Sequence, residues 1–64
     1  MRRTPNYHYI CFVYLHGEIV KSRCFVNEAA KNRYCNKQYD FNPESVVEVY
    51  DFNDIDRLIE TWSA

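Results

Sequence analysis

The sequence predicts a small α+β domain with the element order ββαβα, a three-stranded, mostly antiparallel sheet in the order 2-1-3, and two helices. Two apolar segments flank a His16-Gly17 turn, Asn27 opens a segment of helical composition, and the C-terminal segment repeats apolar residues with the period of a helix. A chain of 64 residues has room for one core. We therefore expect a single domain, 1–64, in which residues 1–6 form a basic N-terminal arm.

Residues 7–15 and 18–26 are expected to form a β-hairpin. Both segments are rich in β-branched and aromatic residues, and His16-Gly17 suits a two-residue turn because Gly, and to a lesser degree His, accepts positive φ. With regular pairing, the core face carries Tyr7, Tyr9, Cys11, Val13, Leu15, Glu18, Val20, Ser22, Cys24 and Val26. The opposite face carries His8, Ile10, Phe12, Tyr14, Ile19, Lys21, Arg23 and Phe25. A slip of one residue would exchange the two sets on the second strand.

Asn27 suits the N-cap of a helix over residues 28–38, since its side-chain oxygen can accept a backbone N–H bond. Helical periodicity places Ala30, Tyr34, Cys35 and Gln38 toward the sheet, and Lys31, Arg33 and Lys37 toward solvent. The Asp-Phe-Asn-Pro sequence of residues 40–43 should end this helix, because proline has no N–H to donate.

Residues 45–50 alternate in the manner of a third strand, and Asn53 is expected to cap a last helix. The four apolar residues of that helix, at i, i+3, i+4 and i+7, are Ile55, Leu58, Ile59 and Trp62. Trp62 should anchor the helix in the core. The helix could join the first one or cover the opposite face of the sheet, and the sequence leaves both arrangements open.

The sequence predicts no catalytic residue, no cofactor and no metal site. His8 and His16 lie at opposite ends of the hairpin, and a single Gly excludes a glycine-rich phosphate loop. Three cysteines without Cys-x-x-Cys spacing indicate free thiols in a reducing compartment. No apolar run reaches the roughly 20 residues that span a membrane, and no signal peptide is recognised. We expect a cytoplasmic protein that acts by binding and is not an enzyme.

Two surfaces are candidate binding sites. Residues 1–39 hold seven basic and two acidic side chains, whereas residues 40–64 hold one basic and seven acidic. The acidic strip consists of Glu44, Glu48, Asp51, Asp54, Asp56 and Glu60. Such a strip is either a solvated surface or a surface that steers the protein to a basic cleft. The alternative site is the sheet face of Phe12, Tyr14, Lys21 and Arg23, which suits a protein interface or the stacking of nucleic-acid bases.

The hairpin, the helix start Val26-Asn27-Glu28-Ala29-Ala30 and the strand Phe41-Asn42-Pro43-Glu44-Ser45-Val46-Val47-Glu48-Val49 resemble small ββαβ proteins encoded by bacteriophages. Some of those proteins inhibit bacterial RNA polymerase, and others block CRISPR effectors or antiviral defences. The resemblance implies an inhibitor or regulator that occludes a larger protein in the cytoplasm of the host cell.

The leading hypothesis is therefore a protein-binding module whose partner is a larger bacterial protein with a basic nucleic-acid-binding groove. One alternative is a single-stranded RNA or DNA binder, which is less expected because the net charge is −1. The other is a homodimeric structural accessory protein. No membrane partner is expected.

Overall fold

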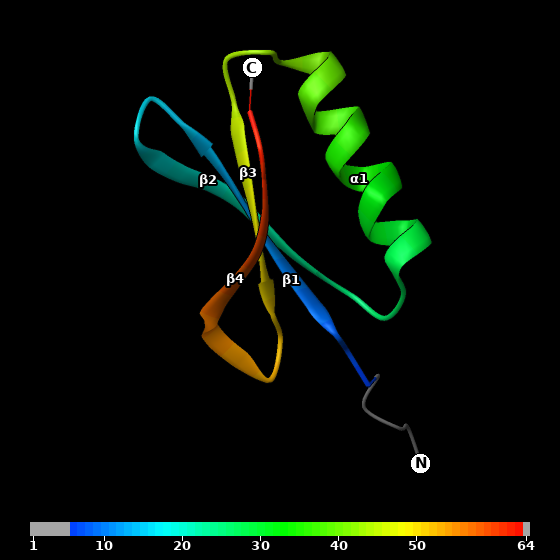
Figure 1. Cartoon of the computed structure of the whole chain (residues 1–64). Coiled ribbons are helices and arrows are strands. Elements are labelled where there is room, and N and C mark those ends of the chain that lie inside the picture. The colour runs from blue at the N-terminus through cyan, green and yellow to red at the C-terminus, as the bar shows by residue number, and fades with distance from the viewer. Residues whose placement is uncertain (1–5, 64) are drawn as a thin grey trace.

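The computed structural model describes residues 6–63 and shows one sheet covered on one face by one helix (Figure 1). The elements follow one another as β1 (Tyr9–Leu15), β2 (Glu18–Phe25), α1 (Glu28–Phe41), β3 (Val46–Asp51) and β4 (Asp54–Trp62). All strand pairs are antiparallel, in the order β2-β1-β3-β4. The N-terminal arm lies, but for its last residue, outside the described residues.

The predicted last helix is wrong: residues 54–62 form β4, so the fold has four strands and one helix. Asp51 pairs with Asp54 across a tight turn, in which the Asn53 N–H donates to Asp51 Oδ1 at 2.9 Å. A helix of nine residues is marginal alone, whereas the edge of β3 offers backbone hydrogen-bond partners to residues 54–62. Pairing with β3 is therefore the more stable arrangement for this segment. Register shifts near Tyr50 make β4 irregular, which is why its apolar residues do not alternate as in a regular strand.

The first three strands have the predicted order, and β3 runs antiparallel to β1 as expected. The register of the hairpin differs from regular pairing. Leu15 pairs with Glu18 as predicted, but Val13 pairs with Lys21, so Val20 is the extra residue of a bulge. The bulge has the effect of a one-residue slip in register. From Lys21 onward, each side chain of β2 therefore lies on the face opposite to the one expected from regular pairing.

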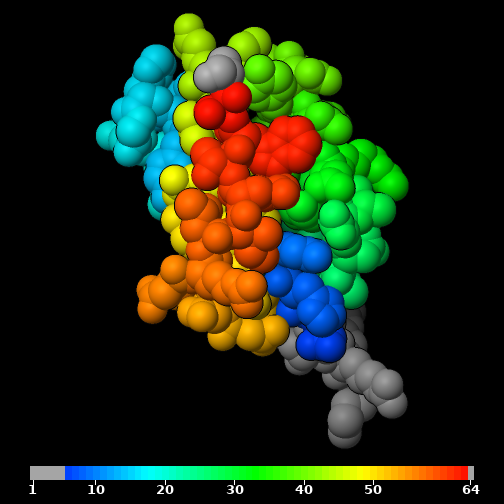
Figure 2. All heavy atoms as spheres, viewed as in Figure 1, coloured from blue at the N-terminus to red at the C-terminus, as the bar shows by residue number. Residues whose placement is uncertain are grey.

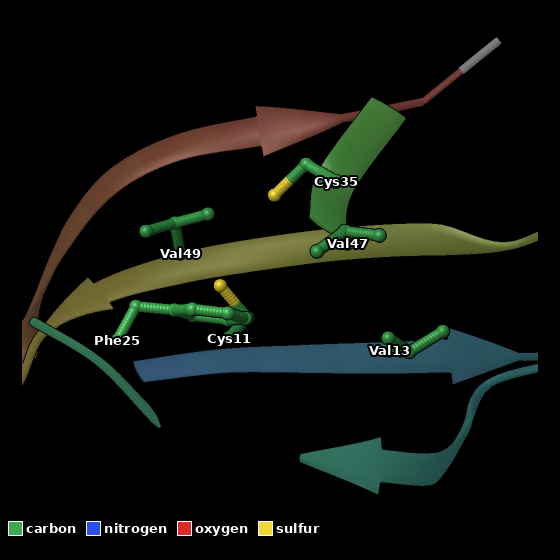
Figure 3. Close-up of a cluster of buried hydrophobic side chains, with 6 residues drawn as sticks. All are labelled: Cys11, Val13, Phe25, Cys35, Val47 and Val49. Atoms are coloured by element: carbon green, nitrogen blue, oxygen red, sulfur yellow. The ribbon is translucent and has the colours of Figure 1, made fainter. Parts of the chain in front are cut away.

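The core lies between the sheet and α1, and its small size suits a domain of this length. Figure 3 shows its six buried hydrophobic residues, which are Cys11, Val13, Phe25, Cys35, Val47 and Val49. Tyr9, Ala30, Tyr34 and Trp62 pack around them, partly buried. Phe25 was expected on the other face and is in the core because of the bulge. Conversely, Val20 is 51% exposed.

The helix α1 begins where the sequence predicts and is longer than predicted. Asn27 is the N-cap, and its Oδ1 accepts the Ala30 N–H at 2.8 Å. The helix continues to Phe41, beyond the predicted end at residue 38, because the restriction imposed by Pro43 acts only on the residue before it. Lys31 was expected to face solvent and instead is buried against the sheet.

Candidate functional site

Among residues 6–63, no helix or further strand covers one face of the sheet, because α1 covers only the other. The strand register identifies the side chains of this open sheet face as those that alternate with the core residues. Its apolar and aromatic members are Ile10, Phe12, Tyr14, Ile19, Val46, Tyr50 and Leu58. Its other members are Ser22, Cys24, Glu48 and Thr61. The open sheet face is therefore mainly apolar, which is unusual for a surface in contact with water.

Three aromatic side chains and one carboxylate lie together on the open sheet face. Phe12 and Tyr50 pack edge to face with ring centroids 5.7 Å apart. The Tyr50 hydroxyl donates to Glu48 Oε1 at 2.9 Å, and this bond raises the pKa of Tyr50. Desolvation and the Glu48 carboxylate raise the pKa of Tyr14 as well. Glu48 thus holds a negative charge among aromatic rings, and no Lys or Arg of residues 6–63 belongs to this face.

The structure separates the four residues of the predicted sheet-face site. Phe12 and Tyr14 belong to the open sheet face, whereas Lys21 and Arg23 lie opposite Val13 and Cys11 on the face that α1 covers. The bulge at Val20 causes this separation. A site that combines these two aromatic rings with these two cations does not form.

Lys21 and Arg23 instead lie along a groove between β2 and α1. Two adjoining hollows of about 240 and 280 Å³ form it, and both are lined by Arg23, Tyr34 and Lys37. Arg33 lines one hollow, and Lys21 and Phe41 line the other. We call this the basic groove.

The acidic strip is dispersed over the molecule. Asp51, Asp54 and Asp56 lie at and beside the turn between β3 and β4. Glu44 lies at the opposite end of β3, with a carboxylate oxygen 4.0 Å from the His16 imidazole. The remaining two are on different faces: Glu48 is on the open sheet face, and Glu60 lies opposite Val49 on the face toward α1. Only the turn aspartates form a local acidic patch.

Glu60 takes part in a partly buried polar cluster. The Lys31 ammonium donates to Glu60 Oε1 at 2.5 Å, and the Trp62 indole N–H donates to the same oxygen at 2.8 Å. The Lys31 ammonium also lies 5.3 Å from the centre of the Tyr9 ring. Desolvation raises the pKa of Glu60, but the two hydrogen bonds and the Lys31 charge outweigh it, so the net pKa is lowered.

Cys11 and Cys35 lie beside this cluster, and Figure 3 shows both sulfur atoms in the space between sheet and helix. All three cysteines of the chain are free thiols. Contact with Cys35 and burial raise the pKa of the Cys11 thiol, so it stays protonated. Cys11 and Cys35 act as small core side chains.

Over residues 6–63, no group of three or more His, Cys, Asp and Glu side chains could hold a metal ion. Within the same residues, no helix is long and apolar enough to cross a membrane.

Comparison with protein-family models, curated proteins and solved structures finds no match to this chain. The surfaces themselves are therefore the basis for inference about function.

The basic groove includes two residues that the sequence reasoning treated only as solvent-exposed, Arg33 and Lys37. A signal for them exists in the sequence. They are four residues apart and so share one side of the helix, while Lys21 and Arg23 are two apart and share one side of the strand. The sequence does not reveal the bulge at Val20, which places Lys21 and Arg23 on the same side of the sheet as Arg33 and Lys37.

Proposed function

We propose that this chain is a protein-binding module that docks through the open sheet face. The observation that supports this most strongly is the uncovered sheet with Phe12, Tyr14 and Tyr50 at its centre. Protein interfaces are enriched in aromatic residues and depleted of charge at their core. Contiguous apolar surface of this kind on a soluble domain marks an interaction site.

The partner is a protein that presents an apolar surface with one Lys or Arg positioned to reach Glu48. Glu48 is half-buried and already accepts the Tyr50 hydroxyl. A partner that covered this carboxylate with apolar groups alone would bury an unpaired charge, at a large cost. A guanidinium or ammonium group removes that cost. Nucleic acid is disfavoured on this face, because a phosphate backbone needs cations where the open sheet face has a carboxylate.

The biological role that we propose is stoichiometric occlusion of a larger host protein, as an inhibitor or regulator from a phage or mobile element. The resemblance of the hairpin, helix start and third strand to small phage-encoded inhibitors supports this role. An uncovered sheet face suits occlusion, because binding alone accomplishes it.

Site-specific photo-crosslinking in bacterial cells tests the proposal. A benzophenone amino acid replaces Tyr14 on the open sheet face or, as the matched control, Phe52 in the turn between β3 and β4. We expect a crosslinked host protein from position 14 only, and we expect Glu48→Lys to abolish it because like charges then meet. The same product from position 52, its survival in the Glu48→Lys variant, or a product with the mass of two chains would overturn the proposal.

The purified partner then distinguishes the open sheet face from the acidic turn. Phe12→Ala should weaken binding at least tenfold, because central aromatic residues carry most of the energy of an interface. The double variant Asp54→Lys and Asp56→Lys should leave the dissociation constant within about twofold. If the double variant loses binding and Phe12→Ala retains it, the acidic turn is the interface.

A further inference from the structure

The basic groove between β2 and α1 is a second surface, on the side of the sheet opposite to the open sheet face. Six Lys and Arg residues lie between residues 6 and 63. Four of them line this groove, and its two hollows have no Asp or Glu in their lining. The other two are Lys31, which is buried, and Arg57, which is on β4. Like charges at this density repel one another, and a bound anionic ligand would offset that cost.

The groove is held in shape by aromatic side chains beneath its cations. The Arg23 guanidinium lies 5.5 Å from the centre of the Phe25 ring and 5.8 Å from that of Tyr34. The two rings pack against each other with centroids 5.1 Å apart. Arg23 is therefore positioned before any ligand arrives, which reduces the entropy that binding would cost.

Phe41 at the end of the groove distinguishes between possible anions. The residue is 87% exposed, the largest exposed fraction among the large hydrophobic residues of the described chain. It lines a hollow together with Lys21 and Lys37. An acidic peptide would need the cations but not the ring, whereas a nucleobase stacks on an exposed aromatic face.

We infer that the basic groove binds single-stranded nucleic acid. The cations of β2 and α1 contact the phosphates, and Phe41 stacks against a base. The near-neutral total charge does not oppose this, because no Asp or Glu lines the two hollows, and Glu18, Glu28 and Asp40 are on β2 and α1 outside their lining. The edge strands β2 and β4 are three strand spacings apart, about 14 Å, which exceeds the screening length of about 8 Å at physiological salt. Asp54 and Asp56 on β4 therefore have little effect at the groove.

Fluorescence anisotropy with labelled ten-nucleotide dT and rU strands tests this inference. The wild-type protein should bind at 50 mM NaCl and lose about 50-fold in affinity at 200 mM, as expected for about four phosphate contacts on a single strand. Binding that does not depend on salt, or no binding at 100 μM protein, would overturn the inference.

Matched variants separate groove binding from general attraction. Lys37→Gln and Arg57→Gln remove the same charge from exposed side chains outside the core. Lys37 lines the groove beside β2, whereas Arg57 is on β4 at the other edge of the sheet. Lys37→Gln should weaken binding about tenfold and flatten the salt dependence, while Arg57→Gln stays within about twofold. Equal effects from the two variants would show that no groove-specific site exists.

Phe41→Ala tests the nature of the ligand. It should weaken binding at least about fivefold with an unchanged salt dependence, because stacking on an aromatic ring is uncharged. If Phe41→Ala has no effect and polyglutamate competes as well as the oligonucleotide, the groove binds acidic peptides and the inference fails. The open sheet face has no part in this experiment, so its result is independent of the proposed protein partner.

Discussion

Lys31 and Glu60 show at the scale of single residues how burial changes the role of a charge. The side chain of Lys31 is 3% exposed, whereas that of Glu60 is 36% exposed. Lys31 is buried because it lies one helical turn before Cys35, on the face of α1 that packs on the sheet, where the Glu60 carboxylate and the Tyr9 ring face it. The charge of a lysine favours an outward position, although Lys31 is four residues before Cys35 and so shares its face of the helix. The ion pair could not be predicted without the position of β4, which carries Glu60.

The two partners should respond unequally to substitution. Glu60→Gln leaves a fully buried ammonium without a counter-charge, although the amide oxygen can still accept its hydrogen bond, and should cost roughly 2 kcal/mol of unfolding free energy at pH 7. Lys31→Met leaves a carboxylate that reaches water and should cost less than about 1 kcal/mol. Urea unfolding measures both. Equal losses would show that burial of the ammonium does not govern the pair.

The same pair makes stability depend on pH. The folded-state pKa of Glu60 is lowered, so its contribution is fully present above the ordinary carboxyl pKa of about 4.3. The contribution is lost as the pH falls through the lowered folded-state pKa. The stability difference between the wild type and Glu60→Gln should therefore shrink on acidification below about pH 4. A difference that stays constant down to pH 2 would contradict the linkage.

At the scale of elements, the turn between β1 and β2 was predictable from two residues. His16 and Gly17 both have positive φ, 53° and 82°, as a type I′ turn requires. Gly17→Ala should cost about 1 kcal/mol. The cause is backbone strain alone, because a Cβ there would meet nothing within 4 Å. His16→Asn serves as the control in thermal unfolding and should be neutral or stabilising, since Asn accepts positive φ more readily. A neutral Gly17→Ala would show that the turn adopts another form.

The strand β4 shows where periodicity fails as a predictor. Ile55, Leu58 and Ile59 match a helical stripe in the sequence, yet they are 64%, 48% and 43% exposed in the structure. The stripe does not mark a buried face. The pairing of β4 with β3 joins residues that a helical period does not relate, such as Val47 and Trp62. Bulges also remove the alternation of apolar and polar residues that would have indicated a strand.

Trp62 anchors β4 to the core in place of the predicted helix. Its ring packs on the core residues, and its N–H donates to Glu60. Trp62→Ala should cost about 3 kcal/mol, the low end for a core aromatic residue, because the side chain is only partly buried. Trp62→Phe keeps most of the ring and should lose about 1 kcal/mol. Denaturant unfolding checks both, and a melting temperature unchanged in Trp62→Ala would show that β4 is not held by this residue.

At the scale of the whole molecule, the sheet has two different sides. The helix covers one side and leaves the basic groove along its seam with β2, and the other side is open. In Figure 2, β4 runs along the molecule beside the helix, in orange and red, and forms one edge of the sheet. The aromatic and basic residues were identifiable from composition and spacing. Their separation onto two sides was not, because it depends on one bulge residue, Val20.

The open sheet face raises the question of why two copies of the chain would not pair through it. Two-fold pairing of this face would enclose two Glu48 carboxylates, and no Lys or Arg of residues 6–63 lies on the face to neutralise them. We therefore predict that the wild-type protein is monomeric at micromolar concentration and that Glu48→Leu converts it to a dimer.

Glu44→Leu is the control, because it adds the same apolar group at an exposed position outside the sheet, and it should remain monomeric. Sedimentation equilibrium measures the mass directly. A wild-type dimer would show that the face pairs with itself, and a monomeric Glu48→Leu variant would show that this carboxylate is not what keeps two copies apart.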